Sequence, residues 1–395
     1  MYLFYLIAIL FAVFLNTPIA ASLGFEKMTT TAFMPIVLYV GFNLIRFPKK
    51  FRYHSEAVSI IVLAIIILIF KWTLNQDFFM AMAQVLIVPM LMSIYFEKLT
   101  QKEFTFLFRV IIIFFIAECG MSIVERILTY NFFEASSEDV EWSNDAGFFR
   151  STALLGHPLA NSYIVAIYMT FIAISNFKRK IVQIILFFLG YVSLFCFSAR
   201  VATIAVTIFT VPYFVWKINK TTPRSKKWII KLGIFCMFFG MFYLVTQTSL
   251  GGRLTGMELL DDSGQTRMDV FQFYKYYQSN DEILWGHPDI VERITKKLGG
   301  AATIENGYIS LLLRFGVIFT IPLLLLLFRF QYRKLSLYSK PEKWLLIAIF
   351  FSIGASTPQF FNYIVWTHWI FAYYVFRHLR AANDQKSLLD EPKKV

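Results

Sequence analysis

The sequence predicts an all-α, polytopic membrane protein with about twelve transmembrane helices. The chain of 395 residues is 57% hydrophobic and 16% charged, whereas a soluble domain carries about a quarter charged residues. Several apolar runs reach the roughly 20 residues that a helix needs to cross the hydrocarbon core. Because lipid offers no hydrogen-bond partners and these runs are continuous rather than alternating, helices are expected instead of a β-barrel.

Each apolar run defines one expected helix. The first has no basic region before it and no convincing cleavage site after it, so it is expected to be retained and not removed as a signal peptide. Residues 1–380 should form one integral membrane domain, and residues 381–395 a polar, disordered cytoplasmic tail. The expected spans are 2–16, 31–47, 56–72, 78–96, 104–124, 156–176, 181–198, 200–216, 228–247, 304–328, 343–356 and 358–376.

The positive charges lie mainly in the connectors on one side of the membrane that these spans would cross. Of the 38 Lys and Arg residues, 25 lie in one set of alternate connectors and 11 in the other. The positive-inside bias therefore places the first set and both termini in the cytoplasm. The formal charge of +13 is explained as an orientation signal, and no nucleic-acid partner is needed. The basic set comprises 46–54, 97–103, 177–180, 217–231, 329–343 and the C-terminal tail.

Two expected outer loops are long, at about 125–155 and about 248–303. The first contains six acidic residues, and the second is long enough to fold as a small extramembrane unit. Helical spacing of Met268, Phe271 and Tyr274 predicts a helix from about Thr266 to Gln278 near the membrane surface.

Neither the repeated tripeptide nor the cysteines predict a functional site. The string Gly-His-Pro occurs at 156–158 and 286–288 without flanking similarity, which we interpret as coincidence. The three cysteines all lie in expected helices, so neither a disulfide nor a cysteine metal site is predicted.

The most informative charged residue is Arg200, in Ser198-Ala199-Arg200, between two apolar runs that leave no room for a normal loop. A guanidinium at that depth is costly unless it is paired or faces a wet cavity, and its planar donors suit phosphate. The alternative is an arginine that extends to the membrane interface. Arg267 opens the helix expected in the large outer loop. Taken alone, it is best interpreted as an ordinary solvated arginine that Asp269 could neutralise.

Candidate acid–base residues lie near the same side. Glu305 precedes Asn306 where the large loop re-enters the membrane, and it could be a helix cap or a general base. Arg150 and His157 bracket a short segment before Pro158, and His157 could be a base, a phosphate donor or an interface residue.

The expected fifth helix carries Glu118, Ser122 and Glu125 on one face near its outer end. Carboxylates inside a membrane usually face a cavity or a partner, so Glu118 is a candidate cavity-lining residue. Arg109 and Arg314 need partners on other helices.

The chain contains no P-loop, dinucleotide fingerprint, His-Glu-x-x-His or Asp-x-Asp motif. No cofactor or metal is therefore expected, and a metal-dependent transferase that uses a nucleotide sugar is disfavoured.

Taken together, several of these residues resemble the O-antigen ligase and Wzy-type polysaccharide polymerase superfamily. The resemblance covers about 145–320 and rests on the Ser-x-Arg turn at Arg200, the helix-opening Arg267, the Asn306-Gly307-Tyr308 re-entry, and Gly316. The stretch from Arg150 through His157 and Pro158 to Asn161 is similar to the family's Arg…His-Pro-Asn segment, although two residues separate Pro158 from Asn161 here.

The resemblance implies a function on the outer face of the bacterial cytoplasmic membrane. Arg200 and Arg267, with Arg150, would hold the diphosphate of a polyprenyl-linked oligosaccharide, and Asn306 and Tyr308 would line the cavity. Glu305 stands where ligases of this family commonly have a His, which favours a polymerase with Glu305 as base; His157 is the other catalytic candidate. A chain-length regulator is a further partner that the resemblance allows. The alternatives are an O-antigen ligase, a lipid-linked oligosaccharide flippase and a membrane scaffold.

Overall fold

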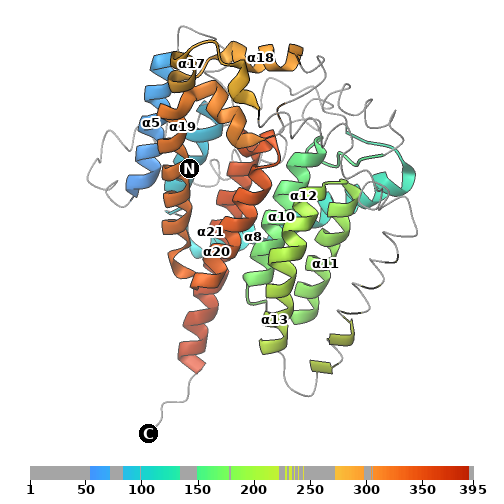
Figure 1. Cartoon of the computed structure of the whole chain (residues 1–395). Helices are drawn as coiled ribbons and strands as arrows, with labels where there is room; N and C mark the ends of the chain where they lie inside the picture. Colours follow the sequence, from blue (N-terminus) through green and yellow to red (C-terminus); the bar gives the residue numbers. More distant parts are fainter. Residues whose placement is uncertain are drawn as a thin grey trace.

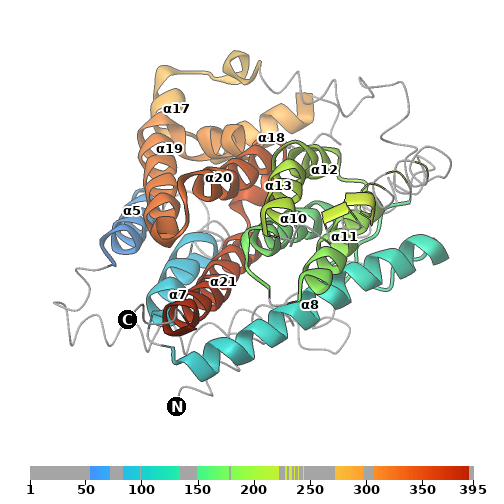
Figure 2. The ribbon, with the colours of Figure 1, turned by 90° about the horizontal axis from the view of Figure 1, so that it is seen from below.

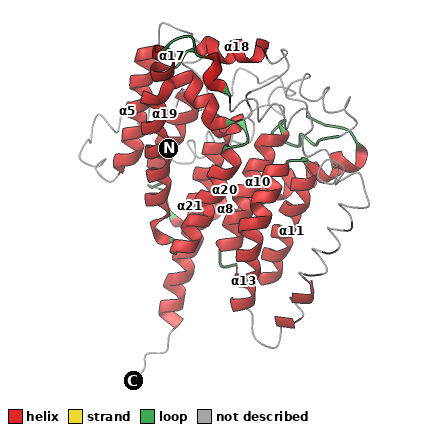
Figure 3. Ribbon diagram, in the orientation of Figure 1, coloured by secondary structure: helices red, strands yellow, loops and turns green. Residues whose placement is uncertain are grey.

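The computed structural model describes the chain as a bundle of helices joined by turns (Figures 1 and 3). None of the described residues lies in a strand. Three described helices are long and apolar enough to cross a membrane, namely Gln101–Leu128, Arg200–Lys220 and Gly307–Leu337. The described residues are 54–71, 83–97, 99–133, 149–177, 179–221, 227–228, 231–233, 235, 239, 243, 272–297, 304 and 306–390.

The described apolar helices overlap the expected spans, although the last one begins at Tyr363 and continues to Asp390 instead of ending at 376. The spans 2–16, 31–47, most of 228–247 and residues 78–82 lie outside the described residues. In chain order the elements are α5 (Ser55–Lys71), the π-helical η2 (Ala83–Ile87), α7 (Val88–Phe96), α8 (Gln101–Leu128), α10 (Pro158–Ile174), α11 (Lys180–Cys196), α12 (Arg200–Ala205), the π-helical η3 (Val206–Thr210), α13 (Val211–Thr221), the 3₁₀ turn η6 (Phe273–Tyr276), α17 (Asn280–Trp285), α18 (Pro288–Lys297), α19 (Gly307–Lys334), η7 (Leu335–Leu337), α20 (Lys340–Gly354), η8 (Pro358–Phe361) and α21 (Tyr363–Asp390).

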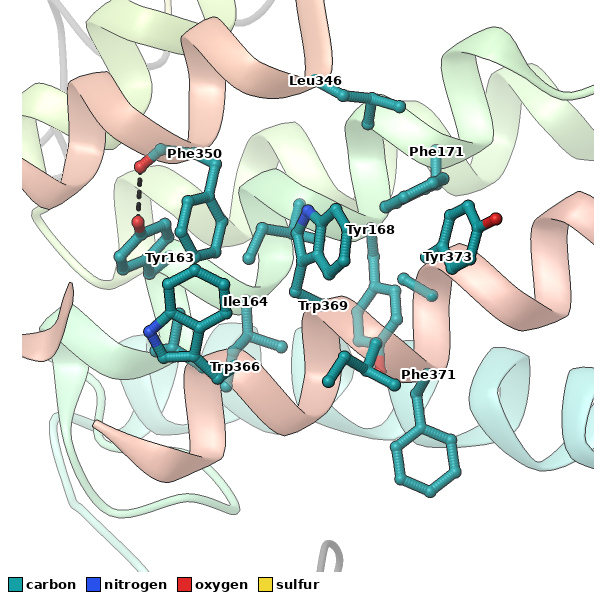
Figure 4. Close-up of a cluster of buried hydrophobic side chains, with 14 of the residues drawn as sticks. Tyr163, Ile164, Tyr168, Phe171, Leu346, Phe350, Trp366, Trp369, Phe371 and Tyr373 are labelled. Atoms are coloured by element: carbon teal, nitrogen blue, oxygen red, sulfur yellow. Dashed lines mark hydrogen bonds between the residues drawn. The ribbon is translucent and has the colours of Figure 1, made fainter. Parts of the chain in front are cut away.

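The helix α10 is the centre of the bundle. All of its side chains except that of Leu159 are buried, because α11, α20 and α21 pack around it. Aromatic side chains fill this interior, and the Tyr163 hydroxyl donates a hydrogen bond to the Phe350 carbonyl (Figure 4). A helix that is apolar on all sides suits such a central position. In the view from below, α8 runs along α11 and α21 at one side of the bundle (Figure 2).

The tight turn expected before Arg200 is present. Phe197–Ala199 connects α11 to α12, and Ser198 has a positive φ of 52°. From Arg200 the chain continues through α12, η3 and α13 to Thr221 as one helix with a π-helical segment in its middle. Arg200 therefore stands at the first turn of a long apolar helix, half-buried.

The helix α19 is interrupted. Gly316 has φ 70° and ψ 175°, so the residues from Gly307 to Phe315 form one helical piece and those after Gly316 another. Two of the carbonyl groups near the break have partners: the Leu311 carbonyl accepts from Thr320 Oγ1 at 3.1 Å, and the Leu313 carbonyl accepts from the His287 N–H at 3.0 Å. Irregular backbone at membrane depth is tolerated when other protein groups satisfy it in this way.

Ion pairs tie α7, α19 and α21 together at the end of the bundle that carries the basic connectors. Glu97 accepts from Lys334 Nζ at 3.0 Å and lies 3.3 Å from Arg377 Nη1. Partial burial pushes the pKa of Glu97 upward, but Lys334 and Arg377 outweigh it and hold that pKa below its usual range. Capping boxes at Thr100 and Ser339 begin α8 and α20 at the same end.

Two expectations about the polar segments are wrong. Residues 266–271 of the helix expected from Thr266 to Gln278 lie outside the described residues, and the rest contains the short 3₁₀ turn η6 and no α-helix. Ser279 then caps α17 by accepting the Glu282 N–H. Among the described residues of this loop, α18 is amphipathic. The segment after Arg380 was expected to be disordered, but α21 continues to Asp390.

Candidate functional site

The candidate site is built on the turn between α8 and α10. Glu125, near the end of α8, is fully buried, and its Oε2 accepts hydrogen bonds from the Ser151 hydroxyl, the Thr152 N–H at 2.9 Å and the Ala153 N–H at 2.8 Å. Its Oε1 accepts from the Phe132 N–H at 3.0 Å. Charge-assisted bonds of this kind are about twice as strong as neutral ones, so one carboxylate fixes the backbone of the turn.

Glu118 lies two turns earlier on the same face of α8. It is fully buried, and its Oε2 accepts from the Leu154 N–H at 3.2 Å. Within the described ranges its Oε1 has no hydrogen-bond partner. Ser122 lies between the two carboxylates and bonds to Ser193 at 2.9 Å. The shared buried face that the sequence predicted is confirmed, and Glu118 contacts the turn; its cavity-lining role stays a prediction.

The same turn is connected to the start of α12. The Ser151 N–H donates to the Cys196 carbonyl at 3.2 Å, and Arg150 Nε donates to the Phe197 carbonyl at 3.3 Å. Both carbonyls belong to the last residues before the tight turn that leads to Arg200. The fold thus brings Arg150 next to the segment that carries Arg200, although 50 positions separate them in the sequence.

His157 closes the other end of the turn as the N-cap of α10. Its Nδ1 accepts the Leu159 N–H at 3.2 Å. Its Nε2 lies 3.3 Å from the side-chain nitrogen of Gln359, and the Gln359 side-chain oxygen accepts from Asn362 Nδ2 at 2.5 Å. While Nδ1 caps the helix, Nε2 is therefore the ring nitrogen that faces the start of η8.

The two Gly-His-Pro strings share this geometry. Gly156 and Gly286 have φ angles of 70° and 69°, and each histidine Nδ1 accepts the N–H two residues later, at 3.2 and 3.3 Å. The following proline begins α10 in one case and α18 in the other, where its missing N–H costs nothing. The repeated string, interpreted from sequence as coincidence, therefore encodes the same helix start twice.

The re-entry segment before α19 is also at this end. Asn306 caps α19 by accepting the N–H groups of Tyr308 and Ile309 at 3.0 and 3.1 Å, and the Tyr308 hydroxyl donates to the Phe351 carbonyl at 2.6 Å. Gly307 packs so closely that a Cβ there would lie 2.8 Å from the Thr357 carbonyl oxygen. Since Thr357 begins the turn η8 that carries Gln359, the starts of α10 and α19 are linked through η8.

Three helix N-termini therefore lie at one end of the bundle, at His157, Arg200 and Gly307. Each contributes a partial positive charge, and the guanidinium groups of Arg150 and Arg200 add two full charges. An anionic group such as a phosphate is the chemistry that this arrangement suits. In the described part of the chain, no three His, Cys, Asp or Glu side chains form a metal-ligand cluster.

The structure places six of the predicted site residues at this end: Arg150, His157, Arg200, Asn306, Tyr308 and Glu118. Glu305 and Arg267 lie outside the described residues. Gln359 was missed, because a lone glutamine after an apolar run carries no sequence signal; its relevance comes only from its contact with His157.

No protein-family model matches the chain, and no curated protein matches it.

Proposed function

We propose that this protein polymerises polyprenyl-diphosphate-linked oligosaccharide repeat units into a surface polysaccharide on the outer face of the bacterial cytoplasmic membrane. In this proposal the chain spans the membrane about twelve times, with both termini in the cytoplasm. The observation that carries the proposal is the gathering of Arg150, Arg200 and three helix N-termini at the end opposite the basic connectors. An anionic lipid headgroup is the ligand class that matches this charge.

The proposed reaction displaces the diphosphate from the anomeric carbon of the growing chain. Negative charge develops on the leaving oxygens, and fixed arginine donors stabilise it by about a few kcal/mol each. Arg200 and Arg267 would hold the diphosphate, with Arg150 beside them. A base on the opposite face activates the acceptor hydroxyl, so the anomeric centre is inverted.

Glu305 is the proposed base. His157 is assigned a second role, because its Nδ1 is engaged in capping α10. In this role its Nε2–H donates a hydrogen bond to a phosphate or sugar oxygen of the substrate. Asn306 and Tyr308, the neighbours of Glu305 in the sequence, fix the start of α19.

The proposal is tested by a matched set of arginine variants in a deletion strain, with surface glycan examined by gel electrophoresis. We expect Arg200→Ala and Arg267→Ala to abolish long chains at normal protein level, and Arg150→Ala to shorten them. Arg293→Ala is the control, since Arg293 lies on α18 and pairs with Glu282 at 2.6 Å. Full-length polymer in both Arg200→Ala and Arg267→Ala would eliminate the diphosphate clamp, and activity in Glu305→Gln would eliminate that base.

Two alternative functions, a ligase and a flippase, would also need a positively charged site for the diphosphate. An O-antigen ligase would need the same clamp, and its deletion would leave full-length lipid-linked chains instead of single repeat units. A flippase for lipid-linked oligosaccharides is favoured by one observation, the interruption of α19 at Gly316, because broken helices are common at transporter binding sites. Purified protein in liposomes distinguishes these functions: a polymerase lengthens lipid-linked glycans, and a flippase only moves them between leaflets.

A further inference from the structure

Glu125 is a buried hydrogen-bond acceptor with four donors around it. Both of its oxygens are surrounded by donors: Ser151, Thr152 and Ala153 at Oε2, and Phe132 at Oε1. The side chain is fully buried, so water does not replace these contacts. A buried acceptor with several donors is costly to disturb, because each abandoned N–H or O–H loses its partner.

The turn that Glu125 holds is strained. Ala153 has a φ of 41°, in the left-handed region that a residue with a Cβ disfavours. Strained backbone persists where surrounding contacts determine it, and such sites cluster at functional positions. Here the contacts come from Glu125, with a further bond from the Asn161 side chain to the Thr152 carbonyl.

The two ends of this turn carry candidate site residues. Arg150 precedes Ser151 directly, and its Nε is aimed at the Phe197 carbonyl. His157 follows the turn and begins α10. A shift of the 151–153 backbone would therefore move a guanidinium and an imidazole together.

We propose that Glu125 is a positioning residue, which acts through the 151–153 turn to place Arg150 and His157 for binding of an anionic lipid headgroup. This inference rests on the proposed function for the identity of that headgroup. Glu125 does not itself contact substrate, because it is enclosed by the turn and α8. Its role is to accept four hydrogen bonds.

The replacement Glu125→Gln separates this role from simple packing. Glutamine has the same shape, but its NH₂ group must face at least one N–H or O–H donor, so part of the turn is released. Glu342→Gln is the matched control. Glu342 is also a buried carboxylate with several donors, Ser339 N–H at 2.9 Å, the Ser339 hydroxyl at 2.8 Å and the Tyr213 hydroxyl at 2.9 Å, but it lies at the opposite end of the bundle.

The experiment measures hydrogen–deuterium exchange of the 151–156 segment and steady-state kinetics in the same detergent-solubilised full-length variants. The kinetic probe is a polyprenyl-diphosphate-linked repeat unit. For Glu125→Gln we expect exchange in this segment to accelerate about tenfold or more, and KM for the lipid-linked donor to rise about tenfold with a smaller change in kcat. Glu342→Gln should leave both the exchange of this segment and KM unchanged.

Ser151→Ala is the second variant, in case Glu125→Gln does not fold. It removes one donor and keeps the carboxylate, so we expect a smaller acceleration and a smaller rise in KM. Unchanged exchange of residues 151–156 in these variants would overturn the anchoring role whatever the activity. Faster exchange with unchanged KM would overturn the positioning role. Faster exchange in a protein whose wild type does not bind or convert the lipid-linked probe would instead remove the proposed function, and the positioning role with it.

Discussion

Gly286 and Gly316 meet backbone to backbone. A Cβ on Gly316 would lie 2.5 Å from the Gly286 nitrogen, and one on Gly286 would lie 2.6 Å from the Arg314 carbonyl carbon. Both glycines have φ near 70°, which residues with a side chain rarely adopt. The α17–α18 hairpin is therefore inserted into the interruption of α19, and Trp285 stacks on Phe70 of α5 beside it.

Replacing Gly316 by alanine should release this hairpin, because the new methyl group has no space and the φ is unfavourable. We expect a stability loss of about 2 kcal/mol or more, measured as a lower Tm in detergent together with faster proteolysis within residues 280–297. Gly120→Ala is the control, since nothing lies within 4 Å of a Cβ there, and it should be neutral or slightly stabilising. A Gly316→Ala variant with wild-type Tm and protease resistance would contradict the packing.

The two Gly-His-Pro helix starts allow the structural and chemical roles of His157 to be separated. Asparagine is a good N-cap, so His157→Asn should keep α10 capped and should change the free energy of unfolding by less than about 1 kcal/mol. It lacks the Nε2 donor, and polymer formation should fall about tenfold or more. His287→Asn makes the same change at α18 and should leave polymer length unaltered. Equal activities of the two variants would argue that His157 is only a cap.

The Glu97 ion-pair cluster predicts a pH dependence of stability. The pKa of Glu97 is lower in the folded protein than in the unfolded chain, so the ionised form favours folding. Its contribution is complete above the ordinary carboxyl pKa of about 4.3 and is lost as pH falls through the lower folded value.

Thermal unfolding of wild type and Glu97→Gln in detergent checks this. The Tm difference should be constant from pH 7 down to about pH 5 and should shrink on further acidification. If the Tm difference between wild type and Glu97→Gln grew below pH 4, the pKa of Glu97 would be raised by folding and not lowered.

Gln331 is a second buried polar side chain in α19, fully inaccessible, and neither amide atom has a hydrogen-bond partner within the described part of the chain. Replacing it with methionine removes an unpaired amide, so we expect a stability gain of about 1–3 kcal/mol, seen as a higher Tm. Gln183→Met is the control. The Gln183 amide nitrogen donates to the Ile172 and Ser175 carbonyls at 2.7 and 2.9 Å, so its loss should lower Tm. A Tm decrease in Gln331→Met would indicate an ordered water at that amide.

The sequence predicted the described apolar helices, because apolar runs of membrane length have few other solutions, but it did not predict α17 and α18. The ends of the helices were predicted less exactly. The helix α8 extends to Leu128, four residues beyond the expected end, and it stops there because Thr129 adopts the left-handed conformation of a C-cap. The interruption at Gly316 was not predicted. A glycine inside an apolar run is common in membrane helices, and only the insertion of the α17–α18 hairpin opens this one.

For the candidate site, the sequence singled out Arg200, because a charge at membrane depth is energetically costly. It singled out Arg150, His157 and Asn306 because they lie in short motifs. It did not predict that Glu125 anchors the turn beside Arg150, because the donors are mostly backbone N–H groups, which every residue carries. It also could not place His157 as the N-cap of α10 opposite Gln359, since that follows from contacts with the Leu159 N–H and the Gln359 side chain.

The amino-acid sequence alone determined the helical class, the apolar spans and the side on which positive charge gathers, because these depend on composition and spacing along the chain. Tertiary structure alone decided which carboxylate holds the 151–153 turn, that Arg150 lies beside the turn before Arg200, and that α19 is broken. Those facts depend on contacts between residues far apart in the chain, such as Glu125 with Ala153 and Gly286 with Gly316, and no local pattern encodes the distance between them.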